Sequence, residues 1–181
     1  MRGPALGAAV VALILGGCAT TGPAPGPAAG PGTAAFNPTD VAWLQLVVPM
    51  TANALVAARM APDRASSTAV RAAASAVVAP SERLLKRLES ARDRAGLPAS
   101  DLHSGHRMPG MVTPADLTAL RTDGGAEFDR RLIALLRAHA AQVVVLARGE
   151  QTSGADPETR ALAGELSAEG ARETALLPTV A

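Results

Sequence analysis

An internal repeat with an offset of 89 residues (129 − 40) limits the folds open to this chain more than any other feature of the sequence. Each copy has a long stretch with helical apolar spacing, a short break with Pro and Asp or Ser, and an Ala-rich second stretch. A repeat of this kind is one supersecondary unit used twice. The offset pairs Asp40 with Asp129, Trp43 with Leu132, Met50 with His139, Ala58 with Ala147, and Arg59 with Arg148.

Helix start signals and apolar periodicity place the individual elements. Pro follows a capping side chain at Asn37-Pro38, Thr113-Pro114 and Asp156-Pro157, an arrangement typical of a first helical turn. Pro80 falls inside the second expected helix and is predicted to kink it or split it. The long helices are expected at about 38–60, 67–95, 126–148 and 157–177, with a short extra helix at 114–121.

Composition agrees with an all-α fold. Hydrophobic residues make up 48% of the chain, but aromatic residues only 2%, with no Tyr. Small aliphatic side chains suit closely packed helices, whereas strands favour aromatic and β-branched residues. Two helical hairpins that bury their apolar stripes against each other predict a four-helix bundle. The net charge of +1 and the scarcity of rings argue against nucleic-acid binding.

The N-terminus has the features of an export signal. Residues 5–15 are uncharged and apolar after Arg2, too short to span a bilayer, which needs about 20 residues. Leu15-Gly16-Gly17-Cys18 resembles the bacterial lipobox. We expect a signal peptide at 1–17, a lipidated Cys18 (diacylglycerol, palmitate) opening a Pro/Gly tether at 18–35, and a helical bundle domain at 36–181. The alternative is an ordinary signal peptide with an unrelated Cys.

Such a protein is expected on the extracytoplasmic side of the cell membrane or outer membrane, attached to it through the N-terminal lipid. Cys18 is the chain's single Cys. Lipidation of this residue excludes a disulfide, a thiolate nucleophile and a thiolate metal ligand.

Several segments together resemble the domain-of-unknown-function 305 family, over residues 36–177. They are Phe36-Asn37, Asp40-Val41-Ala42-Trp43, Met108-Pro109-Gly110-Met111, Gly125-Ala126-Glu127-Phe128-Asp129-Arg130, Ala147-Arg148-Gly149-Glu150 and the 157–177 helix. The resemblance implies a secreted or lipid-anchored, ferritin-like helical bundle. It also implies a link to copper, because some members are associated with copper binding or copper tolerance.

The family's signature is a His-His pair on each long helix, and here the sequence departs from it. The first pair is replaced by Met50-Thr51, and the second falls on His139-Ala140. Asp40 and Asp129 match the acidic positions ahead of each pair. A complete family metal site is therefore not expected. Met50 and His139 remain a candidate pair for Cu(I), which accepts thioether and imidazole, or else they are core residues.

A second candidate copper site lies between the two repeats. His103, His106, Met108 and Met111 are four soft or borderline ligands within one Gly- and Pro-containing loop. The alternative is a flexible loop whose Met-Pro-Gly-Met turn only positions the next helix. Copper is thus a candidate ligand, and no cofactor is certain.

Enzymatic activity is not expected. Acids at helix starts, such as Asp40 and Asp129, are favoured by the helix dipole without any further role. The sequence holds no Ser/His/Asp signature, phosphate loop or zincin motif. The sequence thus indicates a lipid-anchored protein that binds copper through its Met/His loop. The alternatives are an envelope structural or protein-interaction lipoprotein without a metal, its partner unknown, and a binding module built on the Pro80 helix.

Overall fold

Six helices account for most of residues 36–99, 103 and 107–179, which are the part of the chain that the computed structural model describes. No strand is assigned within these residues, which confirms the predicted all-α class. The signal peptide, Cys18, the tether and His106 lie outside the described residues. The helices are α1 (Pro38–Ala58), α2 (Ala61–Arg64), α3 (Thr68–Arg94), α4 (Pro114–Thr122), α5 (Gly125–Ser153) and α6 (Pro157–Leu176).

The predicted Pro-containing helix starts are confirmed. The Asn37 side chain accepts hydrogen bonds from the Thr39 and Asp40 N–H groups at the start of α1. The same role falls to Thr113 at α4 and to Asp156 at α6. Each cap supplies an acceptor for N–H groups that have no partner within the helix.

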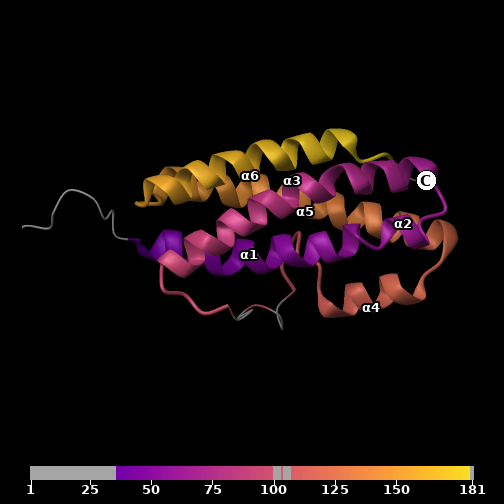
Figure 1. The fold of residues 1–181 in the computed structure, drawn as a ribbon, viewed down its shortest axis with the longest axis horizontal. Coiled ribbons are helices and arrows are strands. Elements are labelled where there is room, and N and C mark those ends of the chain that lie inside the picture. The colour runs from indigo at the N-terminus through magenta and orange to yellow at the C-terminus, as the bar shows by residue number, and fades with distance from the viewer. Residues whose placement is uncertain (1–35, 100–102, 104–106, 180–181) are drawn as a thin grey trace, which may run out of the picture. The chain divides into compact units, whose positions relative to one another are not determined.

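The four long helices of the described chain pack side by side as two pairs (Figure 1). Helix α1 packs against α3 and α5, and α6 packs against α5 and α3. The α5–α6 connection meets the start of α1, and the start of α5 meets the α2–α3 connection. Helix α5 is therefore antiparallel to α1. Helix α4 lies between α3 and α5 in the chain and packs on α1 and α5.

Small aliphatic side chains build the core, as the composition predicts. One buried cluster surrounds Phe128 and Leu132, with Leu117 and Leu120 of α4 in it. A second surrounds Trp43 and includes Leu162 of α6. Ala, Val and Leu make up most of both clusters, and such small side chains let helix axes approach closely.

Helix α3 runs without a break through Pro80, so the chain is not split there. Pro80 has no N–H, which leaves the carbonyl of Ala76 without its helical partner. The guanidinium of Arg172 on α6 lies 3.5 Å from that carbonyl oxygen and donates to it. A neighbouring helix thus supplies the missing donor, which sequence spacing does not reveal.

Within the part of the chain that the structure describes, two stretches are long and apolar enough to cross a membrane by length and composition alone, Pro38–Arg64 and α5, with mean hydropathies of 1.6 and 1.4. The core helix of a soluble protein passes the same test. Of the most apolar window, 56% is buried in the first stretch and 39% in α5. Each of these two stretches has one large exposed hydrophobic side chain, Val56 in α1 and Val145 in α5.

Candidate functional site

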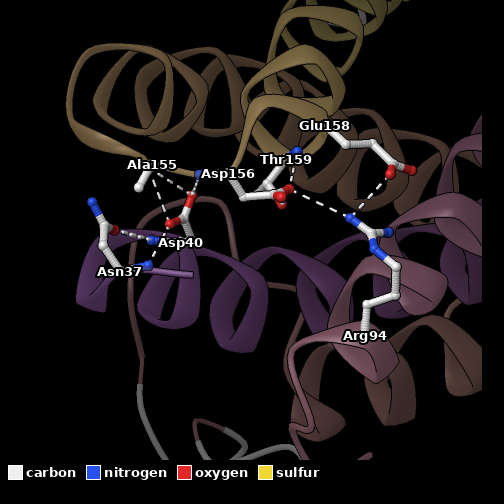
Figure 2. Close-up of polar contacts among 7 residues, drawn as sticks. All are labelled: Asn37, Asp40, Arg94, Ala155, Asp156, Glu158 and Thr159. Atoms are coloured by element: carbon white, nitrogen blue, oxygen red, sulfur yellow. Dashed lines mark hydrogen bonds and ion pairs between the residues drawn. The ribbon is translucent and has the colours of Figure 1, made fainter. Parts of the chain in front are cut away.

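Asp40 joins the start of α1 to the α5–α6 connection (Figure 2). Its carboxylate is fully buried and accepts hydrogen bonds from the N–H groups of Ala155 and Asp156, each at 3.1 Å. It also accepts from the Asn37 N–H at 2.6 Å. The carboxylate thus closes contacts between residues 115 and 116 positions apart in the sequence.

Asp129 likewise joins the start of α5 to the α2–α3 connection. It accepts hydrogen bonds from the Ser66 N–H and hydroxyl at 3.1 and 2.5 Å and from the Ser67 N–H at 2.8 Å. Ser66 and Ser67 are the repeat partners of Ala155 and Asp156 at the offset of 89 residues (155 − 66). The repeated acids are therefore equivalent in structure, each holding the other hairpin's connection, and donors already occupy their oxygens.

Asp156 extends this arrangement to α3. Its carboxylate accepts from the N–H and hydroxyl of Thr159 at 2.7 and 2.6 Å (Figure 2). The guanidinium of Arg94, at the end of α3, lies 3.4 Å from Asp156 and 3.1 Å from Glu158. Three helices therefore meet at this end through polar contacts.

Glu150 is a buried carboxyl that the sequence did not single out. It lies beside Asp40 with only 1% of its surface exposed. Burial, and then the neighbouring Asp40, raise the pKa of Glu150 to about 8. Burial also acts to raise the pKa of Asp40, but hydrogen bonds, the Asn37 backbone first, hold it below its ordinary value. Both Glu150 oxygens lack a hydrogen-bond partner that would stabilise the ionised form, so Glu150 keeps its proton at neutral pH.

His139 is buried in α5 with 4% of its surface exposed. Burial lowers its pKa to about 4, although a hydrogen bond with the backbone of Gly110 acts in the opposite direction. The imidazole is therefore neutral at pH 7, and its Nδ1 has no hydrogen-bond partner. A neutral imidazole with a bare nitrogen is the form that binds a metal ion.

The contact with Gly110 brings together two candidates that the sequence treats separately. Gly110 lies in the Met-Pro-Gly-Met turn, has a φ of 73°, and would place any Cβ 2.8 Å from the carbonyl oxygen of Ala138. Only glycine fits this close approach to α5. Met111 is buried and Met108 half-buried on either side of the contact. His103 is half-buried in a turn of the same loop.

A small polar cavity of about 10 Å³ adjoins His139. Ser81 and Glu173 also line it, and the Ser81 hydroxyl donates to the Glu173 carboxylate at 3.0 Å. Burial raises the pKa of Glu173 to about 7. The volume matches a single water molecule. Met50, a buried residue one turn before Ala54 of the cavity wall, does not line it.

The described residues hold no group of three or more His, Cys, Asp or Glu side chains arranged to bind a metal ion. The donors near the turn are one imidazole and two thioethers. This set suits Cu(I) rather than a hard ion such as Mg²⁺ or a carboxylate-bridged iron pair. The residues near the turn therefore fit copper by the chemical type of their donor atoms.

Comparison with protein-family models shows the family of the chain. The model described as Domain of unknown function (DUF305) matches residues 40–181. The chain belongs to the DUF305 family. The match spans both repeats of this DUF305 protein, and the resemblance seen in the sequence is confirmed. No curated protein matches the chain.

Solved structures share the fold of this DUF305 protein. A DUF305 fragment from Deinococcus radiodurans matches with a TM-score of 0.70 and 23% identity, over 78% of this chain and 94% of that one. A DUF305 protein of Streptomyces coelicolor, described as secreted, gives 0.65 and 20%, over 77% and 89%. CopM in its Cu(II)-bound form gives 0.63 and 23%, over 76% and 92%.

Proposed function

We propose that this DUF305 protein is a lipid-anchored, extracytoplasmic, non-enzymatic protein that binds copper where the Met-Pro-Gly-Met turn meets α5. The observation that carries the proposal is the contact between Gly110 and the buried, neutral His139. It brings an imidazole close in the fold to the thioether-bearing residues Met108 and Met111. His103 and His106 of the same loop are further candidate ligands.

The fold proposed for this role is a ferritin-like four-helix bundle. Two helical hairpins pack against each other, and a long segment containing α4 connects them. The matches to three solved structures, with TM-scores of 0.63 to 0.70, support a shared helical architecture. In such bundles, ligand sites are built from side chains of facing helices.

Chemistry supports copper over other metals. Thioether and imidazole ligands favour Cu(I), and neither needs to lose a proton at neutral pH to bind it. Copper would hold the turn on α5, while the buried surroundings of His139 would limit access of water. CopM, a structural neighbour, carries Cu(II) in its solved form, which supports testing copper first. Met50 is a further candidate deeper in α1.

Export and lipidation are proposed from the N-terminal sequence. Leu15-Gly16-Gly17-Cys18 has the order of residues that a lipoprotein signal requires, and a structural neighbour is described as secreted. We propose attachment to the cell membrane or outer membrane through Cys18. Mass spectrometry of the protein from its native envelope tests this, since loss of residues 1–17 together with an added lipid mass is expected.

Copper binding is tested with the protein lacking residues 1–17, titrated with Cu(I) against a coloured chelator. We expect stoichiometric uptake that is lost when His103, His106, Met108 and Met111 are all replaced by Ala. A His139→Leu variant is expected to weaken uptake at least tenfold. Met60→Leu, at a half-buried methionine outside the turn, is the matched control and leaves uptake unchanged. Equal, weak uptake by all four proteins would contradict the proposal.

The alternative is an envelope structural or protein-interaction lipoprotein that has lost the family metal site. The observation in its favour is that Met50, Thr51 and Ala140 replace three of the four signature histidines, and all three are buried. Copper-free protein from the native envelope would support it. A binding site at the Pro80 helix gains less support, because Arg83, Arg87, Glu165 and Glu169 line the pocket beside Pro80.

A further inference from the structure

The outer side of the α1/α5 pair is almost free of charge. Helix α1 has no charged residue between Val41 and Ala58, and α5 has only the buried His139 as an ionisable group between Ala138 and Ala147. Val145 is 58% exposed on this stretch of α5. The α3/α6 pair differs, because exposed ion pairs such as Arg87 with Glu165 lie on it.

Helix α4 covers the α1/α5 pair near the start of α5, beyond this uncharged stretch. It packs on both α1 and α5 and buries Leu117 and Leu120, three residues apart on its apolar face. The two leucines belong to the same core cluster as Ala57, Phe128 and Leu132, with Met60 and Leu135 packed against it. The remaining side chains of α4 are polar, small or exposed, so α4 is a short amphipathic helix.

The opposite end of the α1/α5 pair carries an open groove of about 400 Å³. We call it the Trp43 groove, and its walls include Ala42, Trp43 and Leu46 of α1 and Leu146, Gly149 and Glu150 of α5. The repeat offset relates it to the surface under α4. It pairs Trp43 with Leu132, Leu46 with Leu135, Leu146 with Ala57, and Gly149 with Met60.

Polar atoms without partners lie in the walls of the Trp43 groove. Trp43 is 5% exposed and its Nε1 has no hydrogen-bond acceptor. Glu150 is 1% exposed, and neither of its carboxyl oxygens has a hydrogen-bond partner. A buried polar group left without a partner costs about 1–3 kcal/mol.

We propose that the Trp43 groove binds a short amphipathic helix of a partner protein, which presents two leucine-sized side chains three residues apart. The groove continues the surface on which α4 already rests, and α4 shows what the equivalent position accepts. Gly149 has open space where a Cβ would stand, so an approaching helix can come close. Arg148 is exposed beside it and favours an acid on that helix. The proposal does not depend on copper.

Trp43 makes the proposal measurable, since it is the only Trp in the chain. The probe is a peptide of residues 113–122, the α4 sequence, cross-linked to hold its helix, added to the full chain. We expect a saturable blue shift of the Trp43 emission. A matched peptide with Leu117→Ala and Leu120→Ala is expected to bind at least tenfold more weakly, because it lacks the two apolar anchors.

Variants of the protein locate the contact. A Cβ at Gly149 meets nothing within 4 Å, so Gly149→Leu places a side chain in the groove, and we expect it to weaken peptide binding at least tenfold with unchanged far-UV circular dichroism. Thr152→Leu also introduces a leucine at an exposed position of α5, but outside the groove. We expect this variant to bind the peptide like the natural protein. Equal binding by the Gly149→Leu variant, or by the two peptides, overturns the proposal.

Other occupants give different results. A shift of Trp43 emission with protein concentration alone, without peptide, would show that a second copy covers the groove. A shift with phosphatidylcholine vesicles but not with peptide would show a lipid surface there. Either result, or no shift with any probe, overturns the assignment to a helix.

Discussion

At one end of the α1/α5 pair, Asp129 holds the α2–α3 connection, and at the other end Asp40 holds the α5–α6 connection. The backbone hydrogen bonds at the two ends are equivalent under the repeat. The surroundings are not. Helix α4 covers the Asp129 end, where Ala61 stands at the position that Glu150 occupies at the Asp40 end. The Asp40 end is open and carries a second buried carboxyl.

Comparing the two ends shows which features both copies of the repeat share and which features differ between them. Buried N–H groups at a helix connection need acceptors, so both copies keep the acid. The apolar surface beside each acid does not have to be covered in the same way. At the Asp129 end α4 covers it, and at the Asp40 end it forms an open groove beside the titratable Glu150.

The largest expected effect comes from removing the repeated acids. Asp129→Ala leaves three donors without an acceptor and is expected to lower the free energy of unfolding by about 3 kcal/mol. Asp40→Ala at pH 8 is expected to cost about 1 kcal/mol less, because it also removes a negative charge beside Glu150. Urea unfolding measures both. Asp93→Ala, at an exposed side chain, is the control and should change stability by less than about 0.5 kcal/mol.

The titration of Glu150 gives the next effect. Its pKa of about 8 lies above the ordinary glutamate value of 4.5, so the folded state keeps a proton that the unfolded chain releases. This contribution to stability is therefore lost as pH rises from 4.5 to 8. Glu150→Gln keeps the size of the side chain and cannot ionise. We expect it to be more stable than the natural protein by about 2 kcal/mol at pH 8, and the difference to shrink toward pH 4.5.

Thermal or urea unfolding at several pH values measures that difference. Glu165→Gln, on the exposed α3/α6 side, is the matched control and should show no such pH dependence. A Glu150→Gln advantage that stays constant from pH 4.5 to 8 would mean that Glu150 does not titrate in this range, and the two ends would then be electrostatically alike.

Two glycines at the Asp40 end give the smallest effect. Gly149 meets open space, and Gly149→Ala is expected to stabilise α5 by about 0.5 kcal/mol through helix propensity. Gly154 follows α5, and a Cβ there would lie 2.7 Å from the Glu150 carbonyl oxygen. Gly154→Ala is expected to destabilise by about 1 kcal/mol. We expect Gly149→Ala to raise the melting temperature and Gly154→Ala to lower it. Shifts of the same sign would contradict the difference in space that the two glycines have at the Asp40 end.

Local rules and the repeat predicted most of the fold. Capping residues placed the starts at Pro38, Pro114 and Pro157, because these signals act within a few residues. Helix α5 runs to Ser153 instead of ending near 148. Gly149, just past the predicted end, is an exposed helical residue ahead of the buried Glu150.

The candidate site was harder to predict, because its contacts are long-range. Gly110 and His139 are far apart in sequence, and only the fold shows that the Met-Pro-Gly-Met turn rests on α5 beside His139. Glu150 was missed because single acids among polar residues resemble solvent-exposed ones. Its pairing with Ala61 under the repeat, a buried residue, was the one available signal.

The contacts at the start of α1 also determine how the molecule would carry mechanical load. Tension applied to the chain ahead of residue 36 would reach the helices first at Asn37, whose side-chain amide donates to the Ser153 carbonyl at 2.8 Å, and at Asp40. The force would pass through these hydrogen bonds into the α5–α6 connection, so α1 would not separate from the bundle by itself. Both hairpins would thus resist a force applied at the N-terminus.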